Sequence, residues 1–359
     1  MSGALFMTGG TGFLGMELIS RMLDAGDGPD IYLAVRARDR GEAEERVAET
    51  IGRLYETPPE SIGRLRAVRA DLTAPELGMS DDDRRTVAAD VERVIHCAAS
   101  ISFTLPLDEA REINVVGTRR VLELASMLPR LERLVHVSTA YVSGRTPQVF
   151  DETQLHGSGF RNTYEQTKAE AEAVLVATDL PSVVVRPSIV VGESDSGWTS
   201  AFNVLYWPLQ AFARGLLPVV PADPDGIVDM VPVDYVAEII ERAAYDPTAS
   251  GRYHAVAADR AVTVRALVDE VCHDLDREPP QLTPADSLPD DHPANVFEPY
   301  FDIGTRFDNR RARELADGAE APHPFTYLPR LLGYGQKARW GKRHMTREAA
   351  RDGAGVRSS

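Results

Sequence analysis

Tyr164 and Lys168, in the stretch "YEQTK", have the clearest capacity for acid–base chemistry in this chain. If the stretch is helical, the two side chains lie four residues apart on one face. A free phenol has a pKa of about 10, too high for efficient acid–base catalysis at neutrality. A neighbouring ammonium, together with the positive charge of an oxidised nicotinamide, would bring that pKa toward working pH. This spacing also arises by chance in many helices, so the pair needs supporting residues.

Two hydroxyl residues, Ser138 and Thr139 in "VSTAYVSG", precede this pair by about 25 positions. They stand where an apolar run, residues 134–138, ends, so we expect a hydroxyl at the carboxyl edge of a sheet. A hydroxyl and a phenol directed at one carbonyl oxygen would stabilise an oxyanion. The combination predicts a site for chemistry at a carbonyl group.

A glycine-rich turn, "LFMTGGTGFLG", indicates where a cofactor would bind. Gly9, Gly12 and Gly15 separate an apolar strand-like run from a helical pattern that begins at Phe13. A strand that turns directly into a helix presents unpaired amides and the positive end of the helix dipole to a phosphate. Glycines let a ligand approach the backbone closely. A plain tight turn between strand and helix remains open on these residues alone.

Arg36 ends the second apolar run, in "LAVRARDR". In dinucleotide-binding folds an acidic residue here binds the adenosine ribose, whereas arginine accommodates a 2′-phosphate. We therefore expect NADPH rather than NADH, with Arg46 nearby either assisting or solvated. Asp71, after the third run, would either accept a hydrogen bond from adenine or cap the next helix.

Short apolar runs alternate with helical patterns along most of the chain, which predicts βαβ units and a parallel sheet wound on both faces. The fold class is therefore α/β, a Rossmann-type doubly wound sheet of about seven strands with a small C-terminal substrate lobe. The runs that predict strands are residues 4–8, 31–35, 65–69, 91–96, 134–138, 182–186 and 252–256.

The alternation breaks after Val191, which predicts the domain organisation. We expect an NADP-binding domain from residues 1–191 plus 227–256, and a lid from residues 192–226 plus 257–330. The lid would stand over the carboxyl ends of the strands, where such sheets bind ligands. Residues 331–359 form a basic C-terminal tail: from residue 330 onward there are eight Lys and Arg against two Asp and Glu. This tail is either solvated or a basic surface for an anionic partner.

Composition excludes several classes of protein. A net charge of -16 argues against nucleic acid as a partner. There is no secretory signal and no apolar run of about 18 residues, so we expect no membrane span. Two cysteines, Cys97 and Cys272, suit a reducing, cytoplasmic compartment, and no metal is expected because no spacing matches a metal site. We expect His96 and His136 to be structural, without a polar partner, and Cys97 to serve packing.

Taken in order, "TGGTGFLG", "HCAASISF", "NVVGT", "VSTAY", "YEQTK" and "VRPSIVVG" resemble the extended short-chain dehydrogenase/reductase superfamily over residues 3–256. With "ADLTAPELGMS", "VDMVPVDYVAEII" and "FEPYFDIGTRFDNRRARELA", the chain is most similar to fatty acyl-CoA reductases and to thioester reductase domains of carrier-protein-dependent synthetases. It departs from both in organisation. Thioester reductases are usually the last module of a giant synthetase, whereas we expect this chain to be free-standing, and animal and plant fatty acyl-CoA reductases carry a further C-terminal domain for which 359 residues would leave little room.

The resemblance implies the site residues. Thr139, Tyr164 and Lys168 would be the catalytic triad, with Asn114 a fourth member. The remaining residues would hold the cofactor, from pyrophosphate and 2′-phosphate through adenine and ribose to the carboxamide: Gly9, Thr11, Gly12, Phe13, Leu14, Gly15, Arg36, Arg46, Asp71, Leu72, Ala98, Ala99, Pro187, Ser188, Ile189 and Val190.

The expected function is NADPH-dependent reduction of an acyl thioester, on coenzyme A or a carrier protein, to an aldehyde and onward to an alcohol. The basic tail could dock an acidic acyl carrier protein. Apolar lid residues would either line an acyl tunnel or form the lid's own core; they are Phe202, Leu205, Tyr206, Trp207, Leu209, Phe212, Leu216 and Leu217.

Three alternatives remain open. An extended reductase acting on a free aldehyde, a ketone or a hydroxysteroid-like alcohol would use the same triad. A nucleotide-sugar epimerase or dehydratase fits less well, because Ala140 and Tyr141 stand where the resembled dehydratases carry an acidic pair. A non-catalytic NADP-sensing regulator of this superfamily would typically lack the Tyr164–Lys168 pair.

Overall fold

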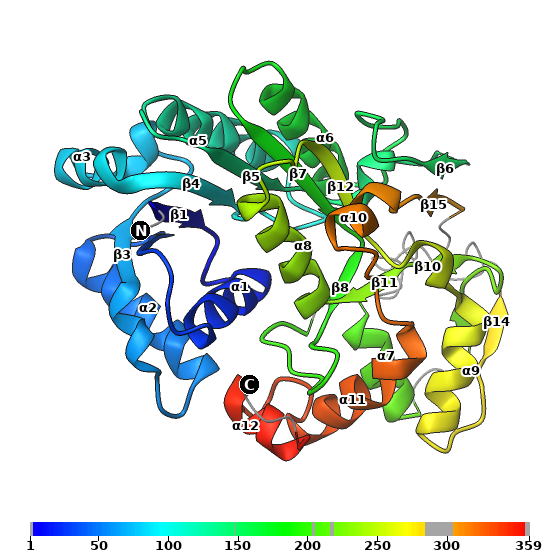
Figure 1. The fold of residues 1–359 in the computed structure, drawn as a ribbon. Helices are drawn as coiled ribbons and strands as arrows, with labels where there is room; N and C mark the ends of the chain where they lie inside the picture. Colours follow the sequence, from blue (N-terminus) through cyan, green and yellow to red (C-terminus); the bar gives the residue numbers. More distant parts are fainter. Residues whose placement is uncertain (1–2, 147, 203–204, 216–218, 284–303, 356–359) are drawn as a thin grey trace.

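A central parallel sheet organises the molecule (Figure 1). The computed structural model describes residues 3–146, 148–202, 205–215, 219–283 and 304–355. Within these residues the sheet has seven strands in the order β12-β7-β5-β4-β1-β2-β3, and every pairing is parallel. The strands are β1 (Ala4–Thr8), β2 (Ile31–Val35), β3 (Leu65–Arg69), β4 (Val91–His96), β5 (Arg133–Val137), β7 (Ser182–Pro187) and β12 (Gly251–Ala255). The predicted fold class is confirmed.

Helices cover both faces of this sheet. Successive side chains along each strand point to opposite faces, so the sheet contributes to two apolar cores, one on each face. Leu5 and Met7 of β1 pack with the face that carries α1 (Phe13–Asp24), α2 (Arg40–Leu54) and α8 (Val233–Tyr245). Phe6, between them, packs with the opposite face. That face carries α3 (Asp81–Asp90), α5 (Gly117–Ser126) and α6 (Thr163–Val176).

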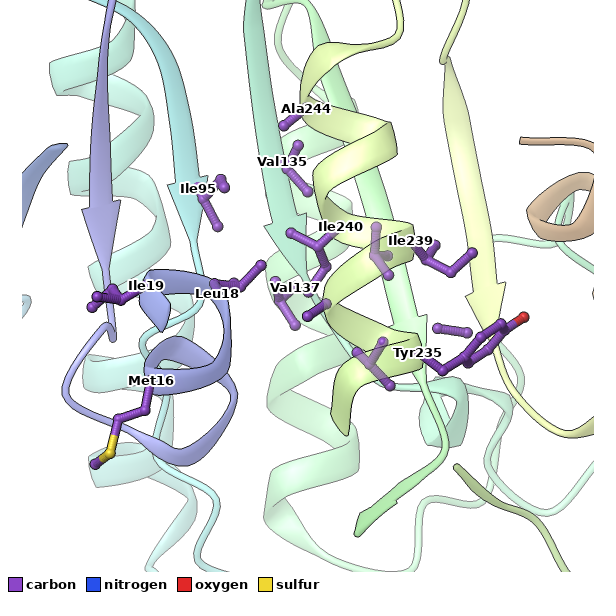
Figure 2. Close-up of a cluster of buried hydrophobic side chains, with 14 of the residues drawn as sticks. Met16, Leu18, Ile19, Ile95, Val135, Val137, Tyr235, Ile239, Ile240 and Ala244 are labelled. Atoms are coloured by element: carbon purple, nitrogen blue, oxygen red, sulfur yellow. The ribbon is translucent and has the colours of Figure 1, made fainter. Parts of the chain in front are cut away.

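Figure 2 shows the first of these cores at the centre of the sheet. Side chains of α1 and α8 meet residues of β4 and β5 that point to the same face, among them Ile95, Val135 and Val137. Because α1 begins directly after β1, this packing fixes the position of the glycine turn between them.

A second group of elements lies beyond β8 (Ile189–Val191), where the chain leaves the main sheet. The helices α7 (Tyr206–Ala213), α9 (Val264–Asp274) and α11 (Pro324–Lys337) pack against one another around a separate apolar core. The remaining elements are short: α4 (Leu107–Arg111), α10 (Arg310–Leu315), α12 (Arg347–Gly353), β6 (Val149–Phe150), β9 (Val219–Pro221), β10 (Ile227–Val228), β11 (Met230–Pro232), β13 (Val262–Thr263), β14 (Gln281–Thr283) and β15 (Arg306–Phe307).

Three of the apolar lid residues lie in the core of the lobe. Leu205, Tyr206 and Leu209 are buried in the core that α7, α9 and α11 share. Leu216 and Leu217 lie outside the described residues. The alternative that these side chains form the lid's own core therefore fits Leu205, Tyr206 and Leu209.

The C-terminal region is not a solvated tail over the residues that the structure describes. The expected boundary at residue 331 falls inside α11, and α12 packs near α1 and α2. Arg347 of α12 is only 3% exposed, because three carboxylates surround its guanidinium: those of Glu17, Asp24 and Glu193. The division into domains otherwise stays a prediction. No helix in the described ranges has the length and apolarity to cross a membrane.

Candidate active site

A cleft of about 630 Å³ runs along the carboxyl ends of the central strands. Loops that follow β1, β2, β3, β4, β5 and β7 all contribute to it, as expected where ligands bind such sheets. Most of the predicted site residues line this one cleft: Gly9, Thr11, Gly12, Phe13, Leu14, Gly15, Arg36, Arg46, Asp71, Leu72, Ala98, Ala99, Thr139, Tyr164, Lys168, Pro187, Ser188 and Val190.

Ile189 and Asn114 are not among the residues that line the cleft. Ile189 packs in the lobe core because side chains alternate along β8, so its neighbours Ser188 and Val190 face the cleft instead. Asn114 lies behind the cleft wall and is 2% exposed. Its amide accepts from Ser100 N at 2.8 Å and donates to Ser100 O at 3.0 Å.

Asn114 also donates to Thr167 Oγ1 of α6 at 3.0 Å. Its side chain therefore joins the loop after β4 to the helix that carries Tyr164 and Lys168. Asn114 therefore supports the cleft wall from behind. The sequence motif around it could not indicate this role, because its partners Ser100 and Thr167 come from other segments.

The glycine turn forms a cradle against α1. Gly9 has a φ of +77°, a conformation that favours glycine, and a Cβ on Gly15 would lie 2.2 Å from Gly9 O. Gly12 is the N-cap of α1, where no side chain caps the helix and the first turn holds no acidic residue. The first backbone amides of α1 are therefore suited to an anion, and the cradle fits the pyrophosphate of a dinucleotide.

The far end of the cleft is positively charged. Arg36 is exposed, and in the described part of the chain no carboxylate lies within ion-pair distance of it. Asp71 Oδ1 accepts from Thr73 N at 2.8 Å and Thr73 Oγ1 at 2.7 Å. Burial raises the pKa of Asp71, but these bonds and the Arg36 and Arg69 charges outweigh it and lower the pKa overall. Asp71 thus closes its own turn, and it does not cap the next helix, Pro75–Gly78, which has no side-chain cap.

The candidate catalytic groups come from two elements. Tyr164 and Lys168 lie one turn apart on α6, whose first turn is capped by the Asn162 side chain accepting from Glu165 N at 2.9 Å. Thr139 follows β5, donates to Pro187 O at 3.4 Å and accepts from Tyr141 N at 3.3 Å. The Thr139 side chain is close enough to the Tyr164 phenol to lower its pKa. The hydroxyl and the phenol are therefore adjacent at the cleft wall.

Burial raises the pKa of Tyr164 well above its ordinary value, and the influence of the Thr139 side chain only partly offsets this. Lys168 was expected to lower the pKa of Tyr164, but it is not among the groups that do so, because its ammonium is directed toward β5 instead. Lys168 Nζ donates to Val137 O at 2.8 Å and lies 3.3 Å from His136 Nε2. Burial also lowers the pKa of Lys168 to about 8. The phenol is consequently held in its protonated form.

Cys97 lines the cleft but is a poor nucleophile. Burial raises the pKa of its thiol to about 11, and the Lys168 charge offsets this only in part. Only a thiolate attacks carbonyl carbons efficiently, so the site does not favour a covalent thioester to Cys97. Ser138 is different: its hydroxyl is buried at the cleft without a hydrogen-bond partner in the described ranges, as expected of a group that meets a ligand.

The expectation that two buried histidines lack polar partners was wrong. His96 lies 2.7 Å from Thr8 Oγ1 and 3.0 Å from Thr118 Oγ1, and His136 lies next to Lys168. Alternation along β5 could have indicated the second contact, since His136 shares the face of Leu134, which packs toward α6. Across the described residues, no three His, Cys, Asp or Glu side chains gather as they would around a metal ion.

The parallel sheet, the glycine cradle and the α6 pair define a protein of the short-chain dehydrogenase/reductase class. The family itself follows from sequence comparison: residues 7–240 match the family described as the male sterility protein, a nicotinamide dinucleotide-binding family. The chain belongs to this family.

Relatives and solved structures accord with that assignment. Fatty acyl-CoA reductase 1 of Xenopus laevis is 32% identical over 278 residues, 67% of this chain and 54% of that protein. The chain thus spans about half the length of the curated relatives it matches.

Among solved structures, the terminal R domain from the myxalamid PKS-NRPS pathway matches with a TM-score of 0.81 and 22% identity, covering 94% of this chain and 91% of that one. A thiolation-reductase di-domain from an archaeal non-ribosomal peptide synthetase matches with a TM-score of 0.73 and 21% identity, over 94% and 76% of the two chains. At these identities the likeness concerns the fold.

Proposed function

We propose that this protein is an NADPH-dependent reductase of acyl thioesters. The observation that carries the proposal is the placement of Thr139 and Tyr164 in the same cleft as the glycine cradle. The names of its relatives, fatty acyl-CoA reductases, favour a thioester as the substrate.

The cleft residues suit NADPH. The cradle from Gly9 to Gly15 would hold the pyrophosphate, and the exposed Arg36, with Arg46 beside it, would hold the 2′-phosphate. Arg46 is already paired with Glu42 at 3.3 Å, so Arg36 is the better candidate for this role. Asp71 and Leu72 would contact the adenine, Ala98 and Ala99 the ribose and nicotinamide, and Pro187 to Val190 the carboxamide.

The chain's own groups would prepare the carbonyl for reduction. NADPH would supply a hydride to the carbonyl carbon. Thr139 and Tyr164 would hydrogen-bond the developing oxyanion, and the raised pKa of Tyr164 keeps its proton available for transfer to that oxygen. Lys168 would hold the nicotinamide ribose. The resulting hemithioacetal would lose a thiol to give an aldehyde. A second NADPH, bound after the first NADP⁺ has left, would supply the hydride for an alcohol, with a second proton from Tyr164.

Apolar residues at the cleft wall favour an acyl substrate. Ile101 lines the cleft and is 58% exposed, and the Phe103 ring lies 6.0 Å from the Tyr164 ring. Burying Ile101 against an acyl group would remove apolar surface from water, at about 25 cal/mol per Å². The acyl group would therefore lie along the loop after β4.

The carrier of the acyl group could be a protein. Four exposed cations follow one another near the end of α11, and none is in an ion pair within the part of the chain that the structure describes: Lys337, Arg339, Lys342 and Arg343. An acidic acyl carrier protein could dock on this basic surface. Coenzyme A is the other candidate carrier.

The first experiment follows NADPH oxidation with a medium-chain acyl-CoA and with the matching free aldehyde in parallel. Consumption with the thioester that is lost in Tyr164→Phe is the expected result. Turnover of the aldehyde alone would instead favour a reductase of free carbonyls, the second candidate, which the same Thr139–Tyr164 pair supports. No turnover with either substrate, with cofactor binding unaffected by Tyr164→Phe, would favour a non-catalytic regulator.

A further inference from the structure

His136 is a buried titratable group that the proposed chemistry does not yet use. It lies on β5 with no exposed surface, and its Nε2 is 3.3 Å from Lys168 Nζ. Its other ring nitrogen, Nδ1, has no hydrogen-bond partner in the described ranges. The contact with Lys168 is therefore its one polar contact there.

The charge state of the pair follows from hydrogen-bonding capacity. A lysine ammonium has three donors and no acceptor, so a hydrogen bond with His136 requires an unprotonated Nε2. Burial, with the nearby charge of Lys168 and the neighbouring His96, holds the pKa of His136 well below its ordinary value. His136 is thus neutral, carries its proton on Nδ1 and accepts from Lys168.

The geometry of the ammonium then decides where its last proton points. One N–H of Lys168 is directed to Val137 O at 2.8 Å and a second to His136 Nε2. Because the three N–H bonds are tetrahedral and Lys168 lines the cleft, the third is free to point into the cleft. Two fixed acceptors on adjacent β5 residues therefore orient the third donor.

We propose that His136 is a positioning residue for Lys168: its Nε2 fixes the ammonium so that one N–H faces the cofactor. This inference rests on the proposed reductase function. The charged or titratable groups facing the pair are Lys168 itself on α6, His96 and Cys97 at the end of β4, and Glu172 one turn further along α6.

Removing the acceptor has a defined effect on pH dependence. A hydrogen bond to the charged form stabilises that form, so its loss lowers the pKa of Lys168 further below its present value of about 8. The ammonium is then lost at a lower pH, and the alkaline limb of the activity profile moves down.

The test compares variants at this one position. His136→Phe keeps the ring volume without an acceptor, His136→Gln places an amide oxygen near the Nε2 position, and His136→Asn carries the same amide one methylene too short. We expect Phe and Asn to lower kcat about tenfold or more and to move the alkaline limb down by about one pH unit. Glutamine should restore both.

His96→Phe is the matched control, because His96 is equally buried and has no hydrogen bond with Lys168 among the described contacts. It should lower the melting temperature and leave the alkaline limb in place. The proposal is overturned if Phe and Asn at position 136 behave as wild type, if glutamine fails to restore activity in a folded protein, or if His96→Phe moves the limb equally.

Failure of the proposed function would be distinguishable. If the wild type turns over neither thioester nor aldehyde, that function is refuted, and the NADPH dissociation constant, measured against pH by nicotinamide fluorescence, decides the role of His136. A shift of this pH dependence to lower pH in His136→Phe and His136→Asn, reversed in His136→Gln, would support the positioning role, and the absence of such a shift would overturn it.

Discussion

Glu17 offers a sharp test of the electrostatics that join α1 to α12. Its side chain has no exposed surface, and its oxygens lie 3.2 and 3.3 Å from the Arg347 guanidinium. Burial raises its pKa, Arg347 lowers it, and the neighbouring Glu193 carboxylate raises it again, to about 8 overall. Glu17 is therefore mostly protonated near neutrality, and Glu17→Gln imitates that form.

The sign and size of the effect follow from the pKa difference. Because the folded-state pKa lies above the ordinary value of 4.5, the stability that protonated Glu17 contributes is fully present below about pH 4.5 and is lost as pH rises through about 8. Each pH unit between these values costs about 1.4 kcal/mol. From pH 6 to pH 8 the wild type should lose about 2 kcal/mol through this group, or about 3 °C in melting temperature.

Paired unfolding curves measure this effect. Wild type and Glu17→Gln are unfolded by urea and by heat at pH 6, 7, 8 and 9, and the difference between them cancels every other titrating group. We expect the Gln variant to be about 2 kcal/mol more stable than the wild type already at pH 6, and its advantage to grow by about 2 kcal/mol more toward pH 8. Parallel pH profiles, or an advantage that grows toward low pH, would refute the reasoning.

Three further predictions concern the cleft. Arg36→Ala should raise KM for NADPH about 10- to 100-fold while leaving KM for NADH nearly unchanged, because it removes only bonds to the 2′-phosphate; an equal rise for both cofactors in steady-state kinetics would contradict this. Tyr164→Phe should lower kcat about 10²- to 10⁴-fold with an unaltered NADPH dissociation constant, and retained single-turnover hydride transfer would contradict its role as proton donor. Gly15→Ala should abolish NADPH binding or lower the melting temperature, since its Cβ would lie 2.2 Å from Gly9 O and 2.5 Å from Gly10 Cα. Gly52→Ala, with open space around it, is the control. If calorimetry showed the same change in NADPH binding and in unfolding for both variants, the packing argument would be contradicted.

The central sheet could be predicted because several of its strands are covered on both faces and are therefore apolar throughout, such as β1 and β2. Residues 4–8, 31–35, 65–69 and 91–96 match the observed strands. The strands predicted at 134–138 and 252–256 each begin and end one residue earlier, and the one predicted at 182–186 ends one residue later. Most candidate site residues came to one cleft for the same reason: the carboxyl ends of parallel strands share one edge.

Contacts between distant segments could not be predicted from local patterns. Arg347 lies 330 residues from Glu17, and in the sequence it belongs to a stretch of basic residues like any solvated tail. Asn114 was expected at the cleft, but its partners Ser100 and Thr167 are set by how two helices and a loop pack. Local spacing shows which face a side chain occupies, and only the tertiary arrangement shows what meets it.

The contact between Arg347 and α1 has a consequence for synthesis of the chain. The helix that follows the glycine turn is synthesised well before α12, yet its buried Glu17 gains a guanidinium partner only when residue 347 has emerged. Asp24 and Glu193 also form ion pairs with Arg347. Until then a nascent chain holds these acidic side chains without Arg347, so the contacts between α1 and α12 form only after α12 has been made.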